Sequence, residues 1–319
     1  MARKFGVRSA PLIRALVAPP GCNIGKTLQT LAQQRQPAVL DAPSPSSLLE
    51  VSMSNTSALQ TLEASRDQIL VMPHLERLFL RHEDGLTVLR NLLARIITLK
   101  KRVLLDCDSW AWVYLQQAMG IEDMLGEPHT FAPFDADRLD AWLRPALKFQ
   151  SHDFRQRGDN EAVFPTTDED TQPRKTKKST FIASLAARSR GNPGVALALW
   201  RASVRTRDIT EEEHEPLEIS GKPFIWLASA ANLTLPELPV DVDRVHRFVL
   251  HSVLLHGGIP RALLDTVLPF SGDDIQRRVS GLRRVGVLEE CNGDLRVPLT
   301  AYPSVRRDLQ NEAFLTDAF

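Results

Sequence analysis

The chain has no excess of charge of either sign. Lys plus Arg and Asp plus Glu each number 39 among 319 residues, so the composition provides no global argument for nucleic-acid binding. Only three cysteines occur, Cys22, Cys107 and Cys291, and their wide separation excludes zinc-site spacing and indicates reduced thiols. No run of about 18 uncharged apolar residues is present, so we expect no membrane span. Polar residues interrupt the N-terminal segment, which also argues against a signal peptide, and we expect a cytoplasmic protein.

One segment, residues 16–27, joins an apolar strand to a glycine-containing turn and the start of a helical pattern. A phosphate-binding loop needs glycines so that backbone N–H groups face the phosphates, a lysine for the β and γ phosphates and a hydroxyl for Mg²⁺. Gly21, Gly25, Lys26 and Thr27 supply these parts. A helix beginning at Lys26 or Thr27 would add its positive end. We therefore predict a nucleotide site with these binding residues: Gly21, Cys22, Asn23, Ile24, Gly25, Lys26, Thr27 and Leu28.

The loop departs from the usual spacing at its first glycine. That glycine stands five residues before the glycine of Gly-Lys-Thr, and Pro20 occupies the position here. Either Pro20 replaces the first glycine, or Gly21 takes its role in a loop one residue shorter. A chance strand, turn and helix that happens to carry Gly-Lys-Thr is the remaining alternative.

Around this loop, residues 11–148 alternate short apolar runs with amphipathic helical patterns. This alternation is typical of βαβ units and a parallel sheet. We predict strands at 12–18, 38–40, 68–72, 102–105 and 130–132. Together with the helices between them, these strands predict an α/β fold with a doubly wound core. Its ligand would lie at the carboxyl ends of the strands, where the Gly-Lys-Thr turn falls.

The second half of the chain changes character several times. Residues 150–179 are polar, and residues 181–201 form a helical pattern that Gly191-Asn192-Pro193 interrupts. From residue 243 onward, three helical patterns precede two short strands joined by Asn292-Gly293, a hairpin signal. These changes predict a P-loop core at 1–149, a flexible polar insertion at 150–179, a helical lid and connector at 180–240, and a winged-helix domain at 241–319.

This order of elements resembles the AAA+ and STAND superfamily of P-loop NTPases, in the branch with a helical lid and a winged helix. The resemblance implies ATP and Mg²⁺ as cofactors. In that family the third strand ends in an acidic pair that holds Mg²⁺ and activates water. Pro73 and His74 stand in those places here, which implies a degenerate Walker B motif. Glu76 lies two residues on and is the nearest substitute, although a residue inside the following helix would point differently.

Two further acids, Asp106 and Asp108, follow the fourth apolar run. This strand occupies the place of the family's polar sensor, or is itself the Mg²⁺-binding strand, and Asp108 is alternatively a helix N-cap. We take Glu76, Asp106 and Asp108 as candidate catalytic residues, and Thr27 with Asp106 as candidate metal ligands. Pro193, in an element similar to the Gly-x-Pro of STAND lids, is the candidate adenine contact.

The third helix of the expected winged helix carries several arginines, which suggests contact with DNA phosphates or base edges in a major groove. They are Arg277, Arg278, Arg283 and Arg284. Acidic residues flank this helix, so a winged helix that contacts a protein partner is the alternative.

Three functional hypotheses follow from these features. The first is an ATP-binding regulator or switch with weak or no hydrolysis, because the water-orienting acid is missing from its usual place. The second is an active ATPase that works on DNA or a partner complex through the winged helix. The third is an adaptor that keeps the fold as a scaffold without nucleotide.

Overall fold

The computed structural model describes residues 13–35, 38–43, 48, 62, 69–98, 100, 102–147, 152–157, 161–164, 179–205, 218–219 and 222–317. The chain divides into two compact units. The first consists of Met1–Phe131, Leu238–Val297 and Val305–Phe319, and the second of Ala132–Glu237 and Pro298–Ser304. Among the described residues, no helix combines the length and the apolar character needed to cross a membrane.

The centre of the first unit is a parallel sheet of five strands. They are β1 (Ile13–Ala18), β2 (Ala38–Val39), β3 (Ile69–Met72), β4 (Arg102–Asp108) and β5 (His129–Thr130). The order across the sheet is β2-β3-β4-β1-β5, and all four pairings are parallel. The predicted α/β fold with a parallel sheet is thus confirmed, and β4 extends three residues beyond its predicted end.

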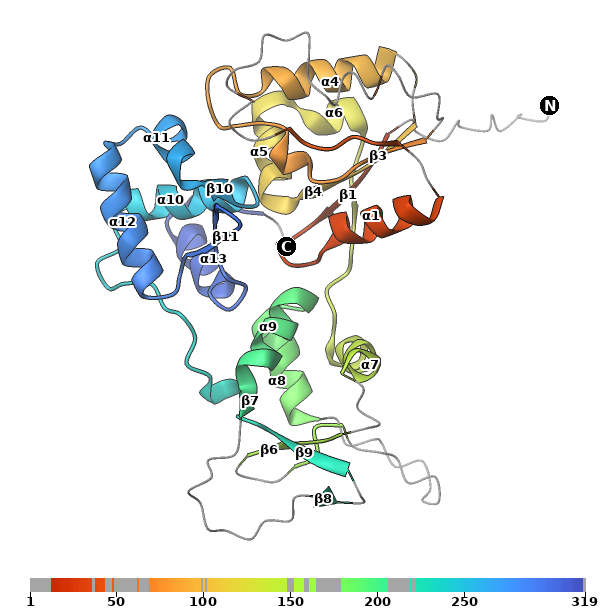
Figure 1. Ribbon diagram of the computed structural model, residues 1–319, viewed down its shortest axis with the longest axis vertical. Helices are drawn as coiled ribbons and strands as arrows, with labels where there is room; N and C mark the ends of the chain where they lie inside the picture. Colours follow the sequence, from red (N-terminus) through yellow and green to blue (C-terminus); the bar gives the residue numbers. More distant parts are fainter. Residues whose placement is uncertain are drawn as a thin grey trace, which may run out of the picture. The chain divides into compact units, whose positions relative to one another are not determined.

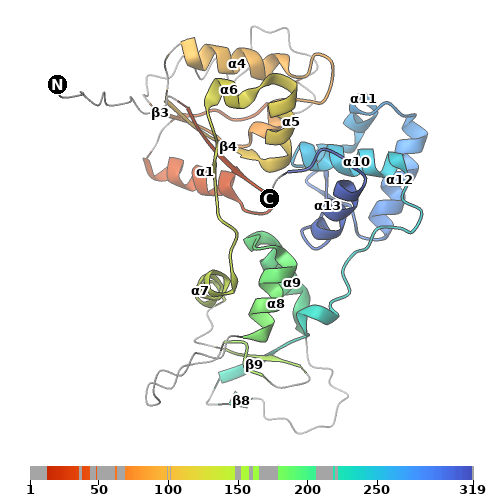
Figure 2. The same ribbon diagram turned by 180° about the vertical axis from the view of Figure 1, so that it is seen from behind.

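Helices cover both faces of this sheet. They are α1 (Ile24–Arg35), α4 (Thr87–Thr98), α5 (Ser109–Met119) and α6 (Ile121–Leu125). Successive strand side chains point to opposite faces, so Leu70 and Met72 join the core beneath α4, α5 and α6, whereas Val71 packs with Leu28 of α1. Figures 1 and 2 show α1 on one side of the strands and α4 to α6 on the other.

Residues 243–317 are here called the C-terminal module. They belong to the first unit, apart from residues 298–304, which belong to the second. Its helices are α10 (Arg244–Leu255), α11 (Leu264–Val267), α12 (Gly272–Arg284) and α13 (Tyr302–Asn311), with a 3₁₀ turn at Arg261–Leu263. Strands β10 (Ile259–Pro260), β11 (Glu289–Cys291) and β12 (Asp294–Arg296) form an antiparallel sheet in the order β10-β12-β11. Asn292 and Gly293 have φ angles of 53° and 84°, as the predicted tight hairpin turn requires.

The second unit combines three helices with a small sheet. Its helices are α7 (Ala136–Ala146), α8 (Thr180–Ser189) and α9 (Pro193–Ser203), with a 3₁₀ turn at Ala230–Asn232. Its strands are β6 (Asp153–Gln156), β7 (Val204–Arg205), β8 (Glu218–Ile219) and β9 (Lys222–Leu227). Strand β6 lies inside the segment 150–179 that the composition predicts to be a polar insertion. It pairs with β9 and buries Phe154, so this part of the segment belongs to a packed core.

The break between α8 and α9 occurs where the sequence predicts it. Gly191 has a φ of 75°, and a Cβ placed there would lie 2.6 Å from Pro133 and 2.7 Å from the backbone nitrogen of Phe134. Asn192 then caps α9 by accepting hydrogen bonds from Gly194 and Val195 N–H, and Pro193 follows as the first residue of the helix. The glycine is required both by its backbone conformation and by the close approach of residues 133 and 134.

Candidate functional site

The loop between β1 and α1 has the backbone of an anion site. Gly21 has a φ of 90° and Asn23 a φ of 53°, and α1 begins at Ile24, two or three residues earlier than the sequence predicts. The N–H of Thr27 donates to the carbonyl oxygen of Asn23 at 3.1 Å. This is the first i−4 hydrogen bond of the helix. The N–H groups of residues 24–26 come before it in the chain, so they lie in the first turn, at the positive end of the helix, where N–H groups have no i−4 partner. The loop therefore presents the donors that a phosphate group requires.

The side chains of the predicted binding residues differ in where they lie. Lys26 and Thr27 are exposed, and the Thr27 hydroxyl donates to the carbonyl oxygen of Asn23 at 3.2 Å. Cys22 is partly buried, and burial raises the pKa of its thiol to about 12. Leu28 is buried and packs with Val71, so its side chain serves the core. The binding roles of these residues stay predictions.

Three acids, here called the acidic cluster (Glu76, Asp106 and Asp108), gather beside the loop. Asp106 and Asp108 lie two residues apart on β4 and pair in register with Leu16 and Ala18 of β1. Glu76 reaches them from a 3₁₀ turn at Leu75–Arg77, and its Oε2 accepts a hydrogen bond from Asp108 N–H at 3.1 Å. The expectation that Glu76 points elsewhere is wrong, because a short turn replaces the expected helix. Asp108 also caps α5, accepting from Trp110 N–H at 3.0 Å, so the N-cap alternative is correct as well.

His74 joins this cluster, a role that the sequence alone did not predict for it. It adopts a left-handed conformation with a φ of 62°, and its N–H donates to Asp106 Oδ1 at 3.0 Å. Its Nδ1 lies 3.0 Å from Glu76 Oε1. A Cβ placed on Gly25 would lie 2.4 Å from His74 Cε1, so the imidazole sits directly against the loop. Its position in place of a Walker B acid was the one sequence signal for this role.

The loop and the cluster together enclose a small cavity. Its volume is about 120 Å³, and residues 18–25 form one wall. His74, the three acids of the cluster and Cys107 form the other. The structure thus brings all three candidate catalytic residues to the predicted phosphate-binding loop.

The protonation of the cluster follows from burial and like charge. Burial, followed by the charge of Glu76, raises the pKa of Asp106 from 3.8 to about 6. The same two causes raise the pKa of Asp108 well above 3.8. The hydrogen bond that the imidazole donates to Glu76 raises the pKa of His74, and burial opposes it. The site therefore holds protons more strongly than isolated side chains would.

We expect Asp106→Asn to stabilise the fold above pH 6. The pKa of Asp106 is higher in the folded chain, so its protonated form stabilises the fold at low pH, and this stabilisation is lost as the pH rises through about 6. A pKa difference from 3.8 to about 6 corresponds to at most about 3 kcal/mol. Urea unfolding of both proteins at about pH 4 and about pH 8 measures this difference, which should grow with pH.

The matched control for this comparison is Asp41→Asn, at an exposed carboxylate that follows β2. It should change the unfolding free energy equally at both pH values. An Asp106→Asn variant that is less stable than the original chain at high pH would contradict the expected charge repulsion.

The predicted metal ligands, Thr27 and Asp106, stay a prediction, and each already has a protein partner. Mg²⁺ requires near-octahedral oxygen ligands at about 2.0–2.1 Å. Asp106 Oδ1 already accepts the His74 N–H, and the imidazole shares the space beside Gly25 with Asp106 Oδ2. Within the described parts of the chain, no group of three or more His, Cys, Asp or Glu residues is arranged to hold a metal ion.

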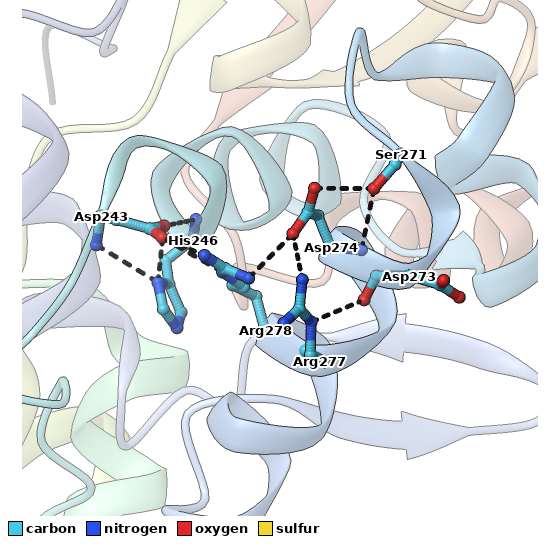
Figure 3. A network of polar contacts seen from close by, with 7 residues as sticks. All are labelled: Asp243, His246, Ser271, Asp273, Asp274, Arg277 and Arg278. Carbon is cyan, nitrogen blue, oxygen red and sulfur yellow. Dashed lines mark hydrogen bonds and ion pairs between the residues drawn. The ribbon is translucent and has the colours of Figure 1, made fainter.

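The arginines of α12 are held by acids of the C-terminal module. Arg278 donates to Asp243 Oδ2 at 2.7 Å and to Asp274 Oδ1 at 3.2 Å, and Arg277 also pairs with Asp274 (Figure 3). Arg283 lies 3.1 Å from Glu290. Arg284 is exposed. This pairing weakens the suggestion that the four arginines form a cationic surface for DNA.

The parallel sheet with the loop after β1 is the α/β arrangement that the sequence predicts for a nucleotide-binding core. No family model and no curated protein matches the chain. Several solved structures are similar to it over most of its length. A RuvB variant of Thermotoga maritima is 12% identical with a TM-score of 0.36, covering 95% of this chain and 88% of that one.

Two further structures give similar values. Cdc6p of Pyrobaculum aerophilum is 13% identical with a TM-score of 0.39, covering 95% of this chain and 88% of its own. The ORC2 protein of Aeropyrum pernix, solved as ADPNP and ADP complexes, is 11% identical with a TM-score of 0.41, covering 93% and 88%. At this level of similarity, the site must be interpreted from the residues of this chain.

Proposed function

We propose that the chain is a nucleotide-binding regulator whose hydrolysis of ATP is weak or absent. One observation supports the proposal most directly. The acidic cluster lies beside the P-loop, but its carboxylates already accept hydrogen bonds from other groups of the protein. Glu76 accepts from Asp108 N–H and contacts His74, and Asp108 caps α5. A water-orienting base must be able to reach the attacking water. Nucleotide binding would rest on the helix N-terminus and Lys26, which do not depend on these acids.

A regulatory role also needs a path from the site to another part of the molecule. The segment 74–81 supports one, because it contacts the C-terminal module. A Cβ on Gly257 would lie 3.1 Å from Glu76 Cγ, and the N–H of Arg81 donates to His256 Nε2 at 3.4 Å. The rings of Phe79 and His256 pack with centroids 5.2 Å apart. Movement of Glu76 on nucleotide binding would therefore disturb the module, which we propose to be a winged helix that contacts a protein partner.

Lys26→Ala should reduce the affinity for ADP and ATP at least about tenfold, or about 1.4 kcal/mol, because the ammonium group would pair with the β and γ phosphates. Isothermal titration calorimetry measures this change directly. The original chain should also unfold at a higher temperature with nucleotide, since saturation at about 100 times Kd stabilises a protein by about 2.7 kcal/mol.

The control for this test is Lys100→Ala. Lys100 is exposed and lies just before β4, at the amino end of the sheet and away from the loop. Unchanged ATP binding by Lys26→Ala would refute the proposal, and the absence of any nucleotide binding would favour the scaffold hypothesis. Appreciable turnover that is lost in Glu76→Gln or Asp106→Asn would instead favour the active-ATPase alternative, acting on DNA or a partner complex.

A further inference from the structure

The chemistry of the P-loop site disagrees with the divalent cation that its fold implies. Four hydrogen bonds engage oxygen atoms of the acidic cluster. Asp106 Oδ1 accepts from His74 N–H, Glu76 Oε2 from Asp108 N–H, and Asp108 Oδ1 from Trp110 N–H, at 3.0, 3.1 and 3.0 Å. The fourth joins Glu76 Oε1 to His74 Nδ1 at 3.0 Å. Both oxygen atoms of Glu76 and one oxygen atom each of Asp106 and Asp108 are therefore already engaged by protein donors.

The two residues at the end of β3 also supply no oxygen ligand. Pro73 has a purely apolar side chain, and the His74 imidazole lies between two carboxylates, 3.0 Å from Glu76 Oε1 and 3.9 Å from Asp106 Oδ2. The same ring contacts the loop so closely that a Cβ on Gly25 would require the imidazole to shift. Mg²⁺ prefers oxygen ligands and gives up its water reluctantly, so an imidazole in this space disfavours it.

The site nevertheless retains a means of neutralising phosphate charge. The N–H groups of residues 24–26 lie at the positive end of α1, a helix of 12 residues, and Lys26 adds a full positive charge in solvent. Backbone donors of this kind bind an anion without an intervening ion.

We infer that this site binds the phosphates of a nucleotide without a divalent cation. The inference rests on the proposed function, because it concerns the same loop. It goes further in stating that the free nucleotide anion, and not its magnesium complex, is the ligand. His74 is a positioning residue here: its N–H donates to Asp106 Oδ1 and its Nδ1 contacts Glu76 Oε1, so one residue engages both acids.

The test compares the affinity of the full chain for ADP and ATP in buffer with excess Mg²⁺ and in buffer with excess EDTA, by calorimetry. We expect the two dissociation constants of each nucleotide to agree within about twofold, or to favour EDTA. An affinity that falls more than about tenfold in EDTA would overturn the inference while leaving the proposed function intact. Absence of binding in both buffers would remove the proposed function, and the inference with it.

A second experiment restores the missing acids. The double variant Pro73→Asp with His74→Glu should bind ADP at least about tenfold more tightly with Mg²⁺ than with EDTA. Its control, Pro73→Ala with His74→Ala, removes the imidazole without adding carboxylates and should stay insensitive to Mg²⁺. A control that becomes dependent on Mg²⁺ would show that Asp106 and Glu76 suffice for a metal site, against the inference.

The left-handed backbone at residue 74 destabilises any non-glycine residue by about 1–2 kcal/mol. His74 is already subject to this destabilisation, so replacing it with another non-glycine residue adds little. Circular dichroism should therefore find the double variant folded. Should it not fold, the comparison of buffers with the original chain decides the inference without it.

Discussion

Asp317→Ala is expected to destabilise the first unit by about 3–5 kcal/mol, because it leaves a buried guanidinium group without its carboxylate. The Asp317 side chain has no exposed surface, and Asp317 Oδ1 accepts from Arg306 Nε at 2.8 Å. Asp317 Oδ2 accepts from the Ser109 hydroxyl. The side chain of Arg306 is only 6% exposed, so water cannot replace the lost partner.

Urea unfolding followed by circular dichroism measures this loss, with Asp308→Ala as the matched control. Asp308 pairs with Arg247 at 2.9 Å, but both side chains are partly exposed, at 22% and 16%. An ion pair of this kind contributes about 1 kcal/mol or less. The double variant Arg306→Met with Asp317→Leu should recover most of the stability that Asp317→Ala loses, because it removes both charges. Equal losses from Asp317→Ala and Asp308→Ala would contradict the burial argument.

The position of Asp317 also connects the end of the C-terminal module to the candidate site. Ser109 is the first residue of α5, and its neighbour Asp108 belongs to the acidic cluster. The charge of Asp317 contributes to the raised pKa of Asp108. We therefore expect Asp317→Ala to affect the acidic cluster as well as the stability of the first unit.

Much of the core could be predicted because its signals are local. The apolar run at 12–18, the glycine turn and Gly-Lys-Thr are contiguous, and the period of the pattern determines which side chains face each layer. The hairpin at Asn292-Gly293 was likewise predicted from two residues. Strands β2 and β5 are each two residues long and are shorter than the apolar runs that predicted them. Hydrogen-bond pairing with the neighbouring strand, and not hydrophobicity, determines where each strand ends.

The arrangement of the site could not be predicted in the same way. Glu76 faces the loop because residues 75–77 form a 3₁₀ turn, which no periodicity distinguishes from the first turn of a helix. The contact of His74 with Gly25 joins two elements that lie far apart in the sequence. The pairing of Arg278 with Asp243 spans 35 residues and decides whether the arginine is available to a partner. Such contacts depend on tertiary packing.

In the second unit, we expect the largest loss of unfolding free energy from Trp200→Ala, about 3–5 kcal/mol. Trp200 is 2% exposed, and its ring packs against three phenylalanines with centroid distances of 5.3 Å to Phe154, 5.5 Å to Phe164 and 5.6 Å to Phe181. Two of these rings come from the segment 150–179, which its polar composition predicts to be an insertion outside the core. The substitution therefore tests whether that segment is part of the folded unit.

Differential scanning calorimetry should show a lower transition temperature for Trp200→Ala, and hydrogen exchange should show faster exchange of amides in β6 and β9. The matched control is Trp142→Ala on α7, where the indole is only partly buried and has Phe134 as its ring partner, with centroids 6.1 Å apart. Trp142→Ala should lower the stability less than Trp200→Ala, because a partly buried side chain removes less apolar surface from water. If Trp200→Ala left exchange in β6 unchanged, the contacts of its ring with Phe154 and Phe164 would contribute little to the stability of that strand.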